Sequence, residues 1–336
     1  MSHELLGHVR AQSQERLAKV QSDLSETDKV FADKACVYAT GSFGRLEAGS
    51  LSDLDLFIVV DVVERDREIQ RAIDQVSEIK LKYSLISVAE SNELPRFDGG
   101  GKFLKTHRID SYVEHMGSQS DDSENTLTGR LLLLLESKCL LGSTVYKKTI
   151  LQVTQKYFKD FENHPGDFVP AYLMNDILRM WRTFCVNYEF NRKDGDSRQK
   201  IKNLRLKFSR MLTCYSGIIY LLAVSARSQT VSPEDVFEMI ALTPTERLMK
   251  IADWRLFPEE ETNELLHRHI DSALSKYAEF LELAHLPIKE SVKRYDKDSS
   301  GWRDKSYEFG RSLFDVIGTL GTMNEHANRV HRLVTV

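Results

Sequence analysis

The chain has 336 residues, of which 41% are hydrophobic and 29% charged, a composition typical of folded globular proteins and not of disordered ones. Lys and Arg number 46 and Asp and Glu number 50, so the formal net charge is −4, which excludes a binder whose whole surface is polycationic. With only 17 glycines and 7 prolines, the chain favours long regular elements, and its length accommodates two hydrophobic cores.

The first half of the chain mixes helix and strand patterns. Residues 3–28 carry apolar positions at helical spacing and predict an amphipathic helix. Short apolar runs predict strands at residues 35–39, 54–60 and 83–89. Charged, helix-periodic residues predict a helix over 64–80, polar residues predict an exposed loop over 117–126, and the five leucines at 131–135 predict a buried helix.

The second half of the chain contains no convincing strand pattern. Helices are predicted near 171–190, 199–226, 233–241, 245–253, 260–285 and 306–332, with a loop over 296–301. The fold class that follows is α+β, with a small mixed sheet in a first domain at residues 1–150 and an all-helical domain at residues 160–336.

The cysteines and the N-terminal residues indicate the compartment. The four cysteines are far apart and form no CxxC pair, which argues against a zinc ribbon or a disulfide scaffold. Charges occur throughout residues 1–22, so no signal peptide is expected, and the longest apolar stretch, residues 217–224, is short for a membrane span. We therefore expect a cytoplasmic protein with reduced thiols and no membrane partner.

One stretch, from Thr40 to Leu56, carries recognisable chemistry. Asp53 and Asp55 are two residues apart in a predicted strand, so both carboxylates should point to the same face, with their Cα atoms about 7 Å apart. Neighbouring carboxylates repel each other unless a cation lies between them. Oxygen ligands of this kind suit Mg²⁺, and a pair of such ions can stabilise the attacking and leaving oxygens of a displacement at phosphorus.

The glycine turn before this pair supplies a second half of the predicted site. Gly41 allows a close approach of the backbone, and the Ser42 hydroxyl can donate to a phosphate oxygen. Eleven residues separate Ser42 from Asp53, which is enough for a short helix and a return into the next strand. The two halves could thus converge on one triphosphate with its metal ions.

These residues resemble the signature of the nucleotidyltransferase superfamily with the DNA polymerase β-like catalytic fold. The fuller form, with Gly44, Arg45, Glu47 and Ser52, is similar to the subset that contains protein uridylyl- and adenylyltransferases. The resemblance covers about 20 residues closely and about the first 115 loosely. It implies that residues 1–150 form the catalytic domain, and that the helical domain covers the nucleotide cleft or binds a partner.

The resemblance also implies roles for particular residues. Asp53 and Asp55 would bind the metal ions and act in catalysis together with Ser42, and Gly41 and Ser42 would hold the phosphates. Arg45 would take part in nucleotide binding or brace the turn through Glu47.

Two further parts of the expected site are less well defined by the sequence. A third carboxylate is common in such enzymes, and Glu90, at the end of the third predicted strand, is the first candidate for a metal ligand. Asp110 and Asp98 are rivals, and all three also fit the description of ordinary surface acids. Lys207, in a dense basic run, is the candidate cation for the triphosphate. Gly99 to Lys102 lacks the spacing of a phosphate-binding P-loop and predicts a mobile loop.

The expected function is transfer of a nucleoside monophosphate (NMP) from a nucleoside triphosphate (NTP) to a hydroxyl group, with release of pyrophosphate. The expected cofactor is Mg²⁺, with Mn²⁺ as a substitute, and ATP or UTP is the favoured nucleotide. The motif favours a protein acceptor, and no template nucleic acid is expected. Two alternatives remain open: a second-messenger synthase that joins nucleotides to each other, and a non-catalytic partner such as an antitoxin-like subunit.

Overall fold

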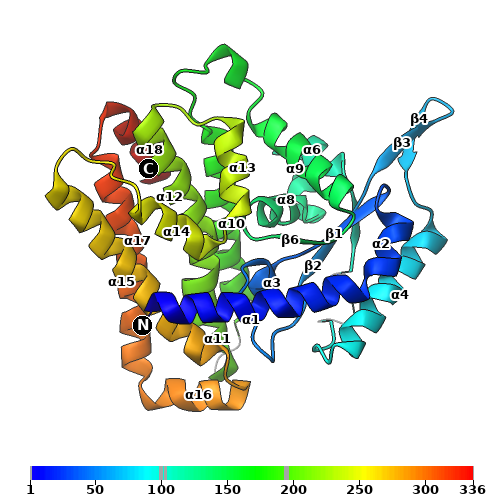
Figure 1. Cartoon of the computed structure of the whole chain (residues 1–336), viewed down its shortest axis with the longest axis horizontal. Helices are drawn as coiled ribbons and strands as arrows, with labels where there is room; N and C mark the ends of the chain where they lie inside the picture. The colour runs from blue at the N-terminus through cyan, green and yellow to red at the C-terminus, as the bar shows by residue number, and fades with distance from the viewer. Residues whose placement is uncertain (1, 98–100, 102–103, 193–196, 336) are drawn as a thin grey trace. The chain divides into compact units, whose positions relative to one another are not determined.

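The computed structural model describes residues 2–97, 101, 104–192 and 197–335. About 70% of the chain is helical, and a small mixed sheet lies in the N-terminal half, so the predicted α+β class is confirmed (Figure 1). Two compact units are present. We call Gly7–Lys156 the sheet unit, and Met1–Leu6 together with Tyr157–Val336 the helical unit.

The sheet unit alternates short strands with helices. Its elements are α1 (Ser2–Asp23, whose first turn belongs to the helical unit), α2 (Ser25–Phe31), β1 (Ala35–Ala39), α3 (Gly41–Gly44), β2 (Leu56–Val60), β3 (Val62–Arg65), β4 (Glu68–Arg71), α4 (Gln75–Ser91), β5 (Thr106–Arg108), α6 (Ser111–Glu114), α7 (Gln119–Ser123), α8 (Thr126–Leu135), β6 (Lys138–Leu141) and α9 (Ser143–Tyr157).

The main sheet has four strands in the order β5-β2-β1-β6. Strand β1 is antiparallel to both of its neighbours, and β2 is parallel to β5, with Ile58 opposite Thr106 and Val60 opposite Arg108. Strands β3 and β4 form a separate two-stranded hairpin. The predicted strand at 35–39 is confirmed, and the one at 54–60 is shortened to Leu56–Val60.

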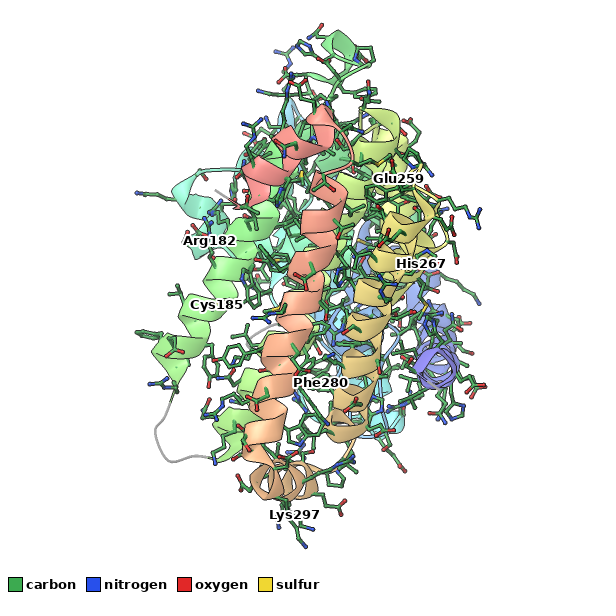
Figure 2. The ribbon with its side chains drawn as sticks, turned by 90° about the vertical axis from the view of Figure 1, so that its left-hand side faces the viewer. Arg182, Cys185, Glu259, His267, Phe280 and Lys297 are labelled. Atoms are coloured by element: carbon green, nitrogen blue, oxygen red, sulfur yellow. The ribbon has the colours of Figure 1, made fainter. Side chains whose placement is uncertain are left out.

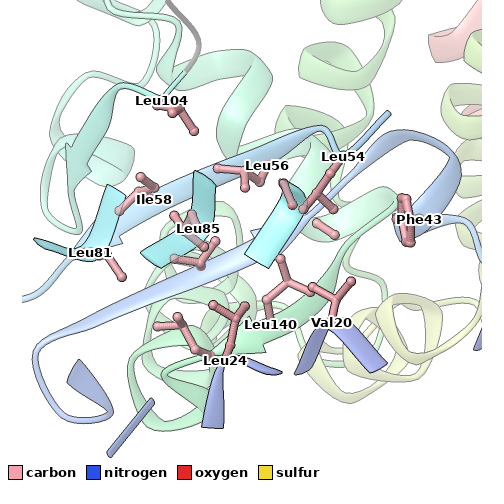
Figure 3. Close-up of a cluster of buried hydrophobic side chains, with 14 of the residues drawn as sticks. Val20, Leu24, Phe43, Leu54, Leu56, Ile58, Leu81, Leu85, Leu104 and Leu140 are labelled. Carbon is pink, nitrogen blue, oxygen red and sulfur yellow. The ribbon is translucent and has the colours of Figure 1, made fainter. Parts of the chain in front are cut away.

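The two faces of the sheet carry different side chains, as the period of two in a strand requires. Leu56 and Ile58 point into one core cluster, which is completed by Val20 of α1, Leu24 directly after α1, and Leu85 of α4 (Figure 3). On the other face, the Phe57 ring stacks on the Tyr38 ring, and the Tyr38 hydroxyl donates to the carbonyl oxygen of Gly129 in α8. The sheet is therefore the middle layer of the unit.

The predicted strand at 83–89 is wrong, because these residues lie inside helix α4. Asp74 caps this helix by accepting a hydrogen bond from the Ser77 N–H. The helix buries Leu81 and Leu85 against the sheet, yet it also exposes Ile79 and Tyr83 by 61% and 71%. Apolar residues on both faces remove the helical periodicity from the sequence, and the β-branched residues then suggest a strand.

Two other predictions in the sheet unit are also corrected. The helix expected over 64–80 is replaced in its first part by the β3–β4 hairpin, and only its end belongs to α4. The loop expected over 117–126 contains helix α7, where Asp121 is fully buried and paired with the guanidinium of Arg130. The buried helix expected at 131–135 is confirmed within α8.

The helical unit contains no strand among its described residues. Its elements are η1 (Phe161–Asn163), α10 (Ala171–Asn191), α11 (Ser197–Arg205), the π-helical turn η2 (Leu206–Arg210), α12 (Met211–Ser228), α13 (Pro233–Ala241), α14 (Pro244–Ala252), α15 (Glu260–Ala284), α16 (Ile288–Lys297), α17 (Ser299–Gly321) and α18 (Glu325–Thr335).

Helices α15 and α17 pack along each other through much of their length (Figure 2). The loop expected over 296–301 is wrong, because α16 ends at Lys297 and the Asp298 carboxylate caps α17 by accepting from the Gly301 N–H. The single helix expected over 306–332 is interrupted between Gly321 and Glu325.

One helical stretch in the described part of the chain, Gln199–Ser228, is long and apolar enough to cross a membrane by composition alone. In the most apolar 18-residue segment of this stretch, 83% of the segment is buried inside the fold. Such burial is typical of a core helix of a globular unit, since a membrane span would present its apolar surface to lipid.

The packing of α4 can be tested by truncating one side chain from each of its two apolar faces. We expect Leu85→Ala to lower the free energy of unfolding by about 3 kcal/mol, because Leu85 is 1% exposed and packs on the sheet. Ile79→Ala, at a 61% exposed position of the same helix, should change it by less than about 0.5 kcal/mol. Urea unfolding measures both variants. Equal losses would contradict the assigned orientation of α4.

His107, on strand β5, is a second element of the sheet unit with a measurable signature. The side chain is 6% exposed and its ring lies 6.0 Å from Phe57 and 5.6 Å from Tyr112, measured between ring centroids. Burial lowers the pKa of His107 to about 4. The folded protein therefore keeps this imidazole neutral at a pH where the unfolded chain protonates it.

We expect the free energy of unfolding to fall as the pH decreases from about 6.5, the unfolded pKa of histidine, towards 4. Between these pH values the imidazole is protonated in the unfolded chain but not in the folded protein. The contribution of His107 to the free energy of unfolding is therefore complete above about pH 6.5, and it has fallen by about 3 kcal/mol at pH 4. In the His107→Asn variant, this decrease in the free energy of unfolding with falling pH should disappear, whatever the absolute stability of the variant. Urea unfolding at a series of pH values measures it, and identical slopes would contradict the buried neutral imidazole.

Candidate active site

Asp53 and Asp55 lie in the extended segment directly before β2, where the sequence placed them inside the strand. Both residues are exposed, and they alternate with Leu54 and Leu56, which are 4% and 6% exposed. The period of two thus continues beyond the end of the regular strand. Both carboxylates leave the backbone on the side opposite the core cluster.

The glycine turn is in contact with the second of these carboxylates. The Thr40 N–H donates to the carbonyl oxygen of Asp55 at 2.8 Å, which joins the end of β1 to the start of β2. Gly41 has a φ of +62°, and a Cβ atom built on it would lie 2.6 Å from Oδ2 of Asp55. Only glycine fits here, because any side chain would be strained in this conformation and would displace the carboxylate.

A buried carboxylate that could not be recognised from the sequence accepts hydrogen bonds from the glycine turn. Glu136, directly after α8, accepts hydrogen bonds from the Gly41 N–H at 3.1 Å and from Nη1 of Arg45 at 2.8 Å. Nε of Arg45 donates to Glu47 at 2.7 Å, which is the predicted bracing contact. The only feature that distinguishes Glu136 in the sequence is its position directly after the five leucines at 131–135.

This arrangement places Arg45 beneath the turn, and its expected part in nucleotide binding stays a prediction. The residue is 7% exposed, and two carboxylates with side-chain exposures of 5% and 0% surround its guanidinium. The planar guanidinium group of arginine binds carboxylates through directed, paired hydrogen bonds. Arg45 is therefore a structural brace for the turn and has little surface left for a phosphate.

The connection between the turn and Asp53 is held by its own polar contacts. The Ala48 N–H donates to Oγ of Ser13 in α1, at 2.9 Å. Gly49 and Ser52 bond to each other twice: the Gly49 N–H donates to Oγ of Ser52 at 3.0 Å, and the Ser52 N–H donates to the Gly49 carbonyl at 3.1 Å. Ser52 of the motif therefore orders the chain immediately before the first aspartate.

Two backbone donors remain available at the turn. Within the described residues, the N–H groups of Ser42 and Phe43 have no acceptor, whereas those of Gly44 and Arg45 donate to the carbonyl groups of Thr40 and Gly41. Ser42 is half-buried, and the Phe43 ring is fully buried in the core. Adjacent free N–H groups next to a hydroxyl form a site that suits phosphate oxygens.

The donor set fits a hard cation only in part. Two exposed carboxylates are suitable ligands for Mg²⁺, and no ion pair involves Asp53 within the described part of the chain. No group of three or more His, Cys, Asp or Glu residues that could hold a metal ion occurs among the described residues. A cation at this place would take its remaining ligands from water and from the phosphates of a substrate.

The positions of Glu90 and Asp110 give no support to either as the third carboxylate. Glu90 is exposed near the end of helix α4, so the strand that suggested it does not exist. Asp110 follows β5, in which Arg108 lies opposite Val60 at the end of β2, whereas Asp55 lies before the start of β2. Because the two strands are parallel, Asp110 and Asp55 are separated by a distance on the order of 20 Å along the strands. Its carboxylate also pairs with the guanidinium of Arg108. Asp98 and the glycine-rich loop from Gly99 to Lys102, apart from Gly101, lie outside the described residues.

Lys207 belongs to the helical unit, on the π-helical turn η2. Its ammonium group lies 4.3 Å from the centroid of the Tyr307 ring. Its part in nucleotide binding stays a prediction.

Residues 17–112 match the family model described as a nucleotidyltransferase domain. This segment contains the Gly41–Ser42 turn and both aspartates, so it is a domain of the nucleotidyltransferase superfamily. The comparison with curated proteins gave no match, and neither did the comparison with solved structures.

The geometry of the turn can be tested with two glycine substitutions. We expect Gly41→Ala to lower the free energy of unfolding by about 1–3 kcal/mol, because the added Cβ meets Asp55 and φ is positive. Gly7→Ala, in helix α1 with no atom near its Cβ position, should raise it by about 0.5–1 kcal/mol. Urea unfolding of both variants checks the pair. A stable Gly41→Ala protein would show that the turn does not need glycine.

Proposed function

We propose that the chain is a Mg²⁺-dependent nucleotidyltransferase that moves an NMP from an NTP to a hydroxyl group, with a protein as the acceptor. The observation that carries this proposal is the contact between Gly41 and the Asp55 carboxylate, next to an exposed Asp53. It brings together the two halves of the family's motif, a phosphate-binding turn and a pair of carboxylates, which are at least eleven positions apart in sequence.

In the proposed reaction, the acceptor hydroxyl oxygen bonds to the α-phosphorus of the NTP while the bond from that phosphorus to the bridging oxygen breaks. Pyrophosphate leaves with the bond's electron pair, and the hydroxyl proton passes to water. Asp53 and Asp55 would hold Mg²⁺, which would neutralise charge on the phosphates. The N–H groups of Ser42 and Phe43, with the Ser42 hydroxyl, would bind the departing phosphates.

The choice of a protein acceptor depends on the fuller motif. Arg45 and Glu47 distinguish the subset of protein-modifying relatives that the sequence resembles, and both form the brace beneath the turn. Mn²⁺ would substitute for Mg²⁺, and ATP or UTP is the nucleotide we propose. The four cysteines are free thiols, which is consistent with work in the cytoplasm.

One observation favours a second candidate, a non-catalytic protein that binds a nucleotide. Among the described residues, Asp53 and Asp55 are the exposed carboxylates at the turn, whereas Glu47 and Glu136 are buried against Arg45, and no group of three residues that could hold a metal ion is found. Such a protein would bind an NTP with Mg²⁺ and transfer nothing. Binding and transfer must therefore be measured separately on the same preparation.

The experiment is incubation of the purified chain with cell extract and each NTP, labelled at the α-phosphate, in the presence of Mg²⁺ or Mn²⁺. We expect label on protein in a denaturing gel. A new small labelled species on a thin-layer plate would instead identify a second-messenger synthase. Binding of NTP in equilibrium dialysis without any transfer would identify the non-catalytic protein.

We expect Asp53→Asn and Asp55→Asn each to reduce transfer by about 100-fold or more, since each removes a charge that holds the metal and its nucleotide. The matched control is Glu64→Gln, which changes an exposed acid of strand β3 to its amide, outside the site. Transfer rates from the labelled gel measure all three variants. Full activity of both aspartate variants would contradict the proposed mechanism.

A further inference from the structure

The helical unit contains an apolar cavity whose lining includes no residue of the nucleotidyltransferase motif. Its volume is about 350 Å³, within the usual range for small-molecule sites. Helix α17 supplies one wall, and η2 with the start of α12 supplies the other. Its lining includes Lys207, Met211, Tyr215, Tyr307, Phe314 and Ile317.

The cavity follows the axis of α17, whose face is visible in Figure 2. Its lining on this helix runs from Ser306 to Ile317, a rise over eleven residue steps that corresponds to about 16 Å. Ile317 is buried, whereas Tyr307 and Phe314 are 63% and 60% exposed. Large aromatic side chains that remain this exposed beside a cavity provide apolar surface for a ligand.

The charge in this cavity lies at one end. Lys207 is next to Tyr307, with its ammonium group over the ring, and Met211 follows one helical turn later opposite Gly310. No carboxylate pairs with Lys207 in the part of the chain that the structure describes. The cavity thus has a cationic end at Lys207 and an apolar end at Ile317.

The backbone that carries Lys207 is unusual. Residues Leu206–Arg210 form a π-helical turn between two α-helical segments. Such turns are rare within α-helices and are found frequently at functional sites. Here the turn sets the position of Lys207 relative to Met211 and Tyr215, which line the cavity on the following turns.

We propose that this cavity binds a small amphiphilic carboxylate, with its carboxylate at Lys207 and its apolar chain or ring along α17. A single unpaired ammonium group selects an anion, and an elongated apolar lining selects the body of the ligand. The site gives Lys207 a role within its own unit that does not require the triphosphate contact expected from the sequence. The proposal is independent of the transfer reaction.

The test is calorimetric titration of the full-length chain with decanoate, decanol and decylamine, which share one chain and differ in the head group. We expect decanoate to bind at least about tenfold more tightly than decanol, and decylamine to bind most weakly. Mg²⁺ and ATP together should not displace decanoate. Equal affinity for decanoate and decanol, no measurable binding, or displacement by ATP would each overturn the proposal.

Two pairs of variants locate the site. Lys207→Met should weaken decanoate binding about tenfold and leave decanol unchanged, whereas Lys202→Met, at an exposed position of α11, should change neither. Gly310→Leu would fill the cavity next to Met211 and should abolish binding of both ligands. Its control is Gly318→Leu in the same helix, where no atom lies within 4 Å of the Cβ position.

Thermal unfolding of each variant keeps the test interpretable. A Gly310→Leu protein that unfolds at the temperature of the Gly318→Leu control yet binds no decanoate supports the site. A folded Gly310→Leu protein that binds decanoate normally overturns it. Titration of Asp53→Asn separates the two proposals, because we expect this variant to bind decanoate normally whether or not the chain transfers a nucleotide.

Discussion

The close approach between the Gly41 backbone and the Asp55 carboxylate is the constraint on which the candidate site depends. A positive φ at residue 41 turns the chain sharply at the end of β1, and the missing side chain leaves room for the carboxylate. The hydrogen bond from Thr40 to the Asp55 carbonyl fixes the same two segments through the backbone. If the site binds a nucleotide as we propose, this fixed geometry would matter, because small displacements of a polyanion beside two carboxylates would change a large electrostatic repulsion.

The buried pair of Arg45 and Glu136 explains how the turn keeps that position. Both charges are almost completely removed from water, so each needs its partner, and breaking the contact would leave an uncompensated buried charge. A pair of this kind adds little net stability compared with apolar packing, but it restricts the directions in which the turn can move. The Glu136 carboxylate also accepts from the Gly41 N–H, so the brace acts directly on the residue that contacts Asp55.

Local patterns predicted the parts of this site that are local in sequence. Strand β1 and the Gly41–Ser42 turn follow from an apolar run that ends at a glycine, and the alternation of Asp53 and Asp55 with buried leucines follows from the period of a strand. Helix α4 could not be predicted in this way, because its exposed face is as apolar as its buried one. Glu136 could not be predicted either, since its partners lie about 90 residues earlier and only the folded sheet brings them together.

With Asp53 and Asp55 as its only exposed carboxylates among the described residues, the proposed site would need the nucleotide itself to complete the coordination of Mg²⁺. Mg²⁺ prefers six oxygen ligands in a nearly octahedral arrangement, and two aspartates supply only part of that shell. The remaining ligands would come from water and from the nucleotide's own phosphates, so metal and nucleotide would stabilise each other's binding. Such coupling fits a chain with a net charge of −4, because one Mg²⁺ would cancel about half of the negative charge of a nucleoside triphosphate before the protein contacts it. In the proposed enzyme, two acids and a few backbone donors would then be enough to bind the metal-bound nucleotide, without a basic surface.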